Sequence, residues 1–285
     1  MVTRGELLAL VDGAPGRLRT LQAALTTWTH RGRVAEVHRR TDMPVPGQGD
    51  DLAGELAADL DDGNSPGGPG LAAVSDEDPQ AESVATSYVV VAPPDRWRLV
   101  GRGYLAVSDG RRNWVGTSTL VTERDSTRAS ISDAGQIGSF LYPGPMLRNL
   151  TFTMPAAADI EGRPCWFVTG VPRTAGRKAP PRGAAGWRSH RDLVGIDHAL
   201  WFDATTGIIL RHEGSIDGEP ASSTSLTDLV FDGTIDSAEF RPPPGAVVRS
   251  RHELLRDHLS SLGVDPDTVD LDDPVQVREA LRQGG

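Results

Sequence analysis

Short runs of alternating apolar and polar residues, separated by turn residues, fill the chain from residue 87 onwards. A repeat of two is typical of strands that bury one face and expose the other. Turn residues recur about every 8 to 14 positions, as they do in all-β domains. We therefore expect strands at 87–92, 96–101, 104–109, 113–118, 120–124, 151–155, 165–171, 199–203, 208–214 and 223–231.

The first forty residues carry a mixed pattern. Leu7, Leu8 and Val11 have the spacing of a helix over residues 5–12. The stretch 18–40 fits a helix through its leucine spacing and a strand through its threonines. We expect a pair of strands in this stretch, joined by a short turn.

The pattern changes again near the C-terminus. After Gly245, the apolar residues Leu255 and Leu259 have helical spacing, and Pro274 suits the first position of a further short helix. Inside the strand-rich region, residues 140–150 interrupt the alternation and predict a turn with a single turn of helix. Helices are thus expected to be few and short.

Residues 43–83 differ from the rest of the chain. They are acidic, rich in Gly and Pro, and almost free of aromatic and β-branched residues, so we expect a disordered insertion. The predicted organisation is an N-terminal helix with the first strands of the main domain (1–42), this insertion, the main antiparallel sheet domain (84–248) and a helical appendage (249–285). The predicted fold class is mainly β: one large curved antiparallel sheet or half-open barrel, with a few short helices on its concave side and at the C-terminus.

Composition and charge narrow the class of function. The net charge of −10 argues against a nucleic-acid-binding protein, which needs a basic face for phosphates. No stretch reaches the ~18 apolar residues of a membrane-spanning helix, and the apolar run 7–11 is too short for an export signal. We therefore expect a cytoplasmic protein without membrane insertion. The single cysteine, Cys165, excludes an internal disulfide and is expected to be a small buried residue.

Few residues have the spacing that catalysis or metal binding requires. Gly101, Gly103 and Ala106 imitate a dinucleotide-binding fingerprint, but a turn follows them where the fingerprint needs a helix. Residues 190–198 include two His and two Asp without the spacing of a tetrahedral site, and we expect a solvated loop and strand edge there. The sequence therefore predicts neither an enzyme nor a cofactor.

Residues 173–191 form a basic cluster in this acidic chain, with five Arg and one Lys around Trp187. Arginine makes bidentate contacts with carboxylates and phosphates, so this loop could dock an acidic partner or the chain's own acidic insertion. A solvated loop without a partner is the alternative. The sequence leaves both interpretations open.

Several motifs occur in an order that is similar to a known bacterial family. They are Pro93–Arg98, Ser108–Gly110 followed by Asn113–Trp114, Gly162–Pro164, Leu200–Arg211 and Phe240–Gly245. This order resembles the lipoprotein-carrier, LppX and RseB-like family, especially uncharacterised actinobacterial members without an export signal. The resemblance covers somewhat over half of the chain. It implies a half-open antiparallel barrel around an apolar cavity, closed by short helices, which holds acyl chains in the exported carriers.

The chain also departs from that family, because it has neither an export signal nor a lipid-accepting cysteine at a cleavage site. We therefore expect the fold to carry over but not the periplasmic transport. The predicted function is a non-enzymatic binding protein that holds an apolar small molecule or acyl chain in the concavity of a curved sheet. The alternative is a protein-protein interaction or regulatory module without a small-molecule ligand. The expected partner is thus a lipid-like molecule or another protein.

Aromatic and apolar residues on predicted strands are the candidates for the ligand site. Trp97, Leu99 and Trp114 are predicted to point inward because they alternate with polar residues. The same side chains could instead simply fill the core. The predicted ligand-binding residues are Trp97, Leu99, Tyr104, Trp114, Phe152 and Trp201.

Overall fold

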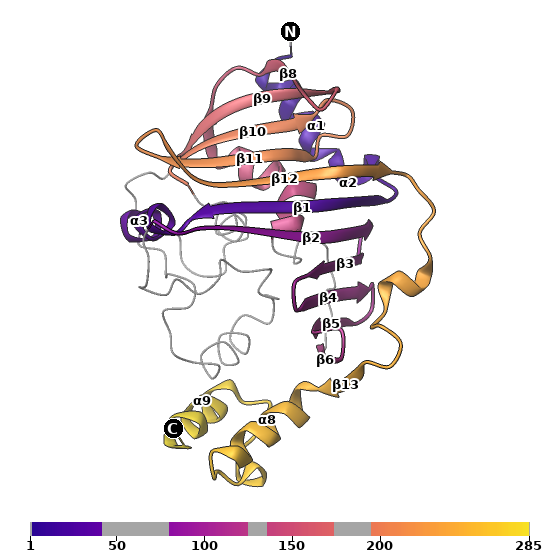
Figure 1. Ribbon diagram of the computed structural model, residues 1–285, viewed down its shortest axis with the longest axis vertical. Coiled ribbons are helices and arrows are strands. Elements are labelled where there is room, and N and C mark those ends of the chain that lie inside the picture. The colour runs from indigo at the N-terminus through magenta and orange to yellow at the C-terminus, as the bar shows by residue number, and fades with distance from the viewer. Residues whose placement is uncertain (1, 42–79, 125–135, 174–194, 285) are drawn as a thin grey trace.

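One open sheet of thirteen strands forms the body of the protein (Figure 1). The computed structural model describes residues 2–41, 80–124, 136–173 and 195–284. The strands are β1 (Leu21–His30), β2 (Glu82–Ala92), β3 (Arg96–Gly101), β4 (Tyr104–Asp109), β5 (Asn113–Gly116), β6 (Leu120–Arg124), β7 (Leu150–Phe152), β8 (Ala156–Ile160), β9 (Arg163–Pro172), β10 (Asp197–Asp203), β11 (Ile209–Ile216), β12 (Glu219–Phe231) and β13 (Val247–Ser250).

The strand order places the N-terminal strand in the middle of the sheet. The order is β13-β6-β5-β4-β3-β2-β1-β12-β11-β10-β9-β7, and β8 pairs with β9 beside β7. Leu21 of β1 pairs with Val91 on one side and with Phe231 on the other, so β1 joins the two halves of the sheet. All pairs are antiparallel except β13 with β6. The mainly β fold with a single large, open sheet is therefore confirmed.

Four short helices cover one face of this sheet. They are α1 (Arg4–Asp12), α2 (Ala14–Arg17), α5 (Gln136–Leu141) and α6 (Gly144–Arg148). We call the face beneath them the inner face, which is the concave side, and the opposite one the outer face. Apolar side chains from these helices and from the inner face form the largest core cluster. The helix predicted over residues 5–12 is confirmed as α1. The helix predicted within residues 140–150 is confirmed as α6, but α5, which precedes it, was not predicted.

Helix α1 begins with reciprocal hydrogen bonds between Thr3 and Glu6. The Glu6 backbone N–H donates to Thr3 Oγ1 at 3.2 Å, and the Thr3 backbone N–H donates to Glu6 Oε2 at 2.8 Å. This arrangement satisfies backbone donors that the first turn of a helix leaves without partners. It also lowers the pKa of the Glu6 carboxyl, chiefly through the bond from the Thr3 backbone. Leu7 and Val11 then point into the core.

The second half of the predicted strand pair at 18–40 is wrong. Residues Arg31–Thr41 form helix α3 instead of a strand. Val34 and Val37 are three residues apart, so they share a helix face, and both are buried against Ile216 and Ala221. This helical spacing outweighs the short-range strand signal.

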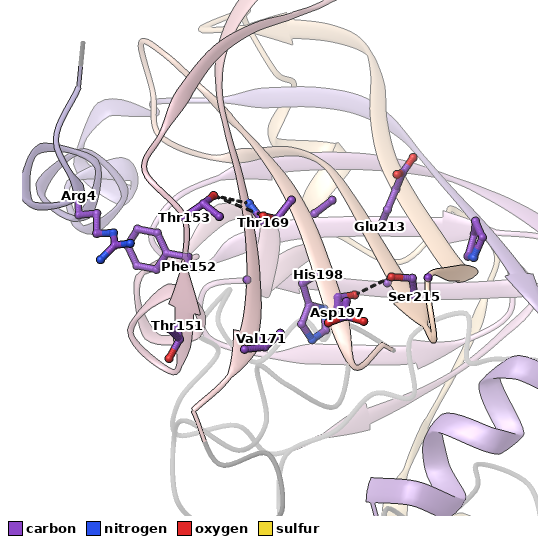
Figure 2. Close-up of a pocket in the computed structure, with 15 residues that line it drawn as sticks. Arg4, Thr151, Phe152, Thr153, Thr169, Val171, Asp197, His198, Glu213 and Ser215 are labelled. Carbon is purple, nitrogen blue, oxygen red and sulfur yellow. Dashed lines mark hydrogen bonds between the residues drawn. The ribbon is translucent and has the colours of Figure 1, made fainter.

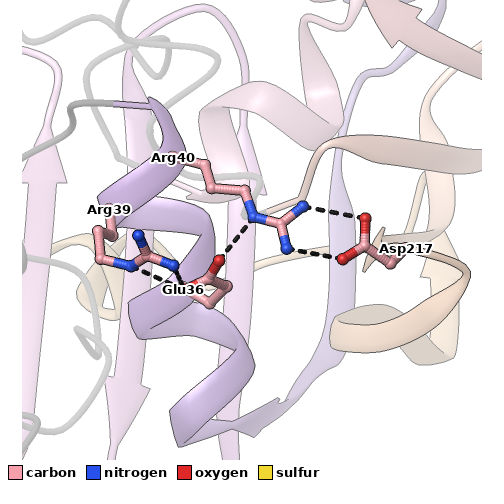
Figure 3. Close-up of polar contacts among 4 residues, drawn as sticks. All are labelled: Glu36, Arg39, Arg40 and Asp217. Carbon is pink, nitrogen blue, oxygen red and sulfur yellow. Dashed lines mark hydrogen bonds and ion pairs between the residues drawn. The ribbon is translucent and has the colours of Figure 1, made fainter.

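Charged residues connect α3 to the turn between β11 and β12 through hydrogen bonds and ion pairs (Figure 3). Arg40 donates from Nη1 and Nη2 to the two Asp217 carboxylate oxygens at 2.9 and 2.7 Å. Glu36 accepts hydrogen bonds from both Arg39 and Arg40 on the same helix. Arg39, Arg40 and Asp217 are exposed and Glu36 is partly exposed, so the network orients α3 rather than contributing much stability.

The C-terminal residues leave the sheet after β13 and form a separate small core. Helix α8 (Arg251–Ser261), the 3-10 helix η3 (Pro266–Thr268) and helix α9 (Pro274–Gly284) follow β13 beyond one end of the sheet (Figure 1). The buried residues of this small core are Leu255, Leu259, Leu271, Val277, Ala280 and Leu281.

Two predicted segments lie largely outside the described residues. The predicted insertion at 43–83 is outside them up to residue 79, and Glu82 and Ser83 belong to β2, so that prediction extended too far. The basic loop at 173–191 is outside them from residue 174. Among the described residues, the longest helices are too short and too polar to cross a bilayer.

Candidate functional site

Trp97 and Leu99 lie on the inner face, as predicted. Leu99 pairs with Val89 of β2 and with Ala106 of β4, and all three belong to the inner core. Trp97 pairs with Val91 and is 2% exposed. Residues directly opposite one another in antiparallel strands share a face, so these side chains form one continuous apolar row.

Trp114 lies on the outer face, so its predicted inward position was wrong. It pairs with Val107, the neighbour of Ala106, and successive residues of a strand point to opposite faces. Its ring belongs to a separate cluster with Leu105, Val107 and Val121. The turn between β4 and β5 sets the register, and a shift of one residue exchanges the faces.

Trp201 pairs with Phe167 on the face opposite to Leu200, although it also packs against the inner core cluster as a partly buried residue. Its neighbours Leu200 and Phe202 are fully buried on the inner side. Its ring lies 4.8 Å from that of Phe167, centroid to centroid, and the Arg211 guanidinium lies 5.4 Å from its ring centroid. This is a partly exposed aromatic and cationic contact on the outer face.

Phe152 and Tyr104 are the remaining predicted residues, and both contribute to the inner core. Phe152 on β7 is 6% exposed and pairs with Gly170 of β9. A side chain at Gly170 would place its Cβ 3.2 Å from the Cβ of Phe152, so the glycine makes room for the ring. Tyr104 is partly buried against the same cluster. The inner face thus unites Trp97, Leu99, Tyr104 and Phe152.

Sequence reasoning overlooked most of the inner face because it selected aromatic residues. The alternation that could have found the missing positions is clear in β1, where Leu21, Ala23 and Leu25 are buried in turn. The missed inner-face residues are Leu21, Ala23, Leu25, Val89, Val91, Val168, Leu200, Phe202 and Leu226.

Helices α5 and α6 cover the middle of this face. Phe140 and Leu147 are 0% exposed, and Ile137, Leu141 and Met146 are each 1% exposed. The two helices have only six and five residues. Helices of this length are not stable alone in water and depend on packing against the sheet. The inner face is therefore an apolar surface closed by short elements.

A pair of histidines occupies the inner face near one end of β10 and β11. His198 is 4% and His212 1% exposed, so the predicted solvated position for His198 was wrong. His198 Nδ1 lies 2.9 Å from His212 Nε2. Burial, followed by the proximity of His198, holds the pKa of His212 well below its usual range. Asp197 is exposed on the opposite side of the strand, so it does not join His198 in a ligand set.

A groove of about 530 Å³ lies over β7, β9, β10 and β11, and His198, but not His212, is among its lining residues (Figure 2). Its lining mixes polar with apolar residues, and the Arg4 guanidinium lies 5.8 Å from the centroid of the Phe152 ring at one end. The backbone N–H of Thr169 donates to Thr153 Oγ1 at 3.0 Å within it. The groove lacks the closed apolar walls that an acyl chain requires.

Other reactive groups in the described residues are held in structural roles. Cys165 is 2% exposed, as predicted, and burial followed by the nearby Asp159 and Asp203 raises the pKa of its thiol. A thiol with a raised pKa is a poor nucleophile at neutral pH. No three His, Cys, Asp or Glu side chains gather within the described part of the chain to hold a metal ion. The segment at Gly101 to Ala106 is a β-hairpin, which confirms that it is not a dinucleotide-binding turn.

Comparisons with known proteins give structural neighbours only. No family model and no curated protein matches the sequence. The structure is similar to MucB, with 12% identity, a TM-score of 0.42, and coverage of 86% of this chain and 64% of that chain. It is also similar to LprF from Mycobacterium bovis, with 9% identity, a TM-score of 0.39, and coverage of 87% and 100%. A LolA superfamily protein from Nitrosomonas europaea has 11% identity, a TM-score of 0.31, and coverage of 85% and 98%.

Proposed function

We propose that the protein is a non-enzymatic, cytoplasmic binding protein that takes up an acyl chain or a similar apolar molecule against the inner face of its sheet. The supporting observation is the apolar core cluster on the inner face, which extends from β9 to β4 and is closed by helices of only four to nine residues. Such helices can move away without breaking any strand pairing. The ligand would then replace helix side chains on the sheet.

Magnitudes are consistent with reversible binding. Each methylene group that leaves water contributes about 0.8 kcal/mol, so a chain of about sixteen carbons contributes roughly 12 kcal/mol. Association costs at least about 4 kcal/mol, which leaves an affinity in the micromolar range. Each apolar helix side chain that the ligand displaces into water lowers this affinity further. The protein should therefore bind and release its ligand rather than hold it permanently.

The test is a titration with a fluorescent fatty acid. The wild-type protein should bind it saturably, and Phe140→Ala should bind it about tenfold more tightly because the ligand fills the space left by the ring. The matched control is Leu105→Ala, which removes an equally buried apolar side chain from the outer-face cluster. It should lower stability without changing affinity.

Two results would contradict this function. One is the absence of saturable binding by folded protein across several chain lengths. The other is an equal change in fatty-acid affinity for the Phe140 and Leu105 variants, which would show that binding does not depend on the inner face.

The second candidate function is protein-protein interaction, and the outer face favours it. Trp201, Phe167 and Arg211 form a partly exposed cluster there. Trp and Arg are enriched among the residues that dominate binding energy in protein interfaces. Co-elution of a protein from cell extract that is lost with Trp201→Ala, together with a ligand-free mass, would favour this candidate over the first.

A further inference from the structure

A second groove, of about 660 Å³, lies on the outer face between the β4–β5 turn and the segment that leads into β13. Trp114, Glu123 and Val248 line it. Trp114 pairs with Glu123, and Val248 pairs with Val121, which belongs to the same cluster as Trp114. These residues therefore lie on one face, and the groove is separate from the inner apolar face.

Three arginines surround this groove. Arg112 Nη1 lies 3.4 Å from Glu123 Oε1. Within the described chain, the guanidinium groups of Arg111 and Arg241, which are both exposed, have no hydrogen bond or ion pair. Asp109 and Glu123 also line the groove, so Arg111 and Arg241 are the cationic groups that it offers to a ligand, in a protein whose net charge is −10. Arginines outnumber carboxylates in its lining, which favours an anionic ligand.

The backbone that carries these arginines is fixed. Asp109 Oδ1 accepts hydrogen bonds from the backbone N–H groups of Arg111 and Arg112 at 2.8 and 2.9 Å. The carbonyl oxygen of Arg241 accepts one from Arg98 Nη1 at 3.2 Å. Both walls are therefore held in place while two guanidinium heads stay available, so little backbone ordering remains to oppose binding.

Strand β13 ends the sheet beside this groove. The backbone N–H of Val247 donates to the Thr119 carbonyl oxygen at 2.8 Å, toward β6. Backbone groups of successive residues point to alternate sides, so those of Val248 point away from β6. Val247 and Val248 are 57% and 47% exposed, and no described strand pairs with β13 on that side. An exposed edge of this kind accepts a further strand.

We propose that β13 and this groove together dock an extended acidic segment of a partner polypeptide. The segment pairs with the outer edge of β13 next to Val248. Every second side chain of an added strand shares the face of the groove, so acidic residues at alternate positions meet Arg111 and Arg241. This inference deepens the second candidate function and is independent of acyl-chain binding.

The experiment measures fluorescence anisotropy of a labelled peptide with alternating Glu and Val. Wild-type protein should bind it saturably, and raising the salt from about 50 to 300 mM should weaken binding. The double variant R111A/R241A should lose at least about tenfold in affinity. The matched control is R19A/R102A, which removes two exposed arginines outside the groove and should leave affinity unchanged.

A second variant tests the edge itself. Val248→Pro removes an N–H that points away from β6, so it should weaken peptide binding while the pairing of β13 with β6 persists. Fatty-acid binding by R111A/R241A and V248P should equal that of the wild type, which separates this inference from the proposed function. Absence of saturable peptide binding would overturn the inference. Equal losses of peptide affinity in R111A/R241A and R19A/R102A would also overturn it. So would displacement of the peptide by inorganic phosphate together with unchanged peptide binding by V248P, because that result would indicate a small-anion site.

Discussion

His198 Nδ1 and His212 Nε2 lie 2.9 Å apart, and both rings are buried between strands on the inner face. One ring donates the shared proton and the other accepts it, so the pair needs at least one neutral ring. Protonating both would place two positive charges in contact away from water. The pair therefore makes the fold sensitive to acid.

The pH dependence follows from the lowered pKa of His212. In the unfolded chain its imidazole titrates near the ordinary value of 6.5, whereas burial and His198 keep it neutral in the folded protein to lower pH. The unfolded state thus binds more protons, so this contribution to stability is present above pH 6.5 and is lost as the pH falls below it. The melting temperature should drop between pH 7 and pH 5 by several degrees more in the wild type than in H198N/H212N. Equal drops in both proteins would contradict this prediction.

Asp203 should be the most sensitive carboxylate in the described sheet. Its Oδ1 accepts hydrogen bonds from the backbone N–H groups of Thr205 and Thr206 at 3.0 and 2.6 Å, and Oδ2 contacts Arg163. Burial alone would raise its pKa, but the bonds from Arg163 and Thr206 outweigh burial and lower the pKa. Asp203→Ala should cost about 3 to 5 kcal/mol of unfolding free energy, because it leaves these donors without their acceptor.

Chemical denaturation measures this cost against a matched control. Asp267→Ala removes an exposed carboxylate that pairs with Arg256, and it should cost less than about 1 kcal/mol. Similar losses in the two variants would show that Asp203 does not organise the β10–β11 loop.

Gly207 should tolerate no side chain. Its φ is +82°, and a Cβ there would lie 2.6 Å from the Leu10 carbonyl oxygen, in helix α1. Gly103 has a φ of +72° with nothing within 4 Å of an added Cβ. Gly103→Ala should therefore cost only the ~1 to 2 kcal/mol of its backbone conformation, and Gly207→Ala should cost about 2 kcal/mol more. Denaturation midpoints that agree for the two variants would contradict the close contact with α1.

Individual strands were predictable because their patterns are local. The predicted strands 96–101, 104–109 and 120–124 agree with β3, β4 and β6 to the residue. Strand β8 was missed because its sequence, Ala156–Ile160, is poor in β-branched residues and gains its conformation from pairing with β9. Helix α3 was missed because its local signal is limited to the spacing of Val34 and Val37, and their packing against Ile216 and Ala221 cannot be read from the sequence.

The candidate site was less predictable than the strands. Alternation within a strand says which residues share a face, but not which face lies inward. That choice depends on the turn before each strand, as Trp114 shows by pairing with Val107 rather than with Ala106. The helices that close the inner face pack mainly against strands that are distant in sequence, so local patterns could not reveal that the face is covered.

Quenching of tryptophan emission by a brominated fatty acid tests the central claim most directly, because bromine quenches only rings in contact with it. Trp97 is buried within the inner core cluster, whereas Trp201 is only partly buried against it and pairs with Phe167 on the outer face. If the acyl chain binds the inner face, quenching should be saturable in the wild type, should fall sharply in Trp97→Phe and should persist in Trp201→Phe. Quenching that is lost in Trp201→Phe and kept in Trp97→Phe, or that never saturates, would contradict binding at the inner face.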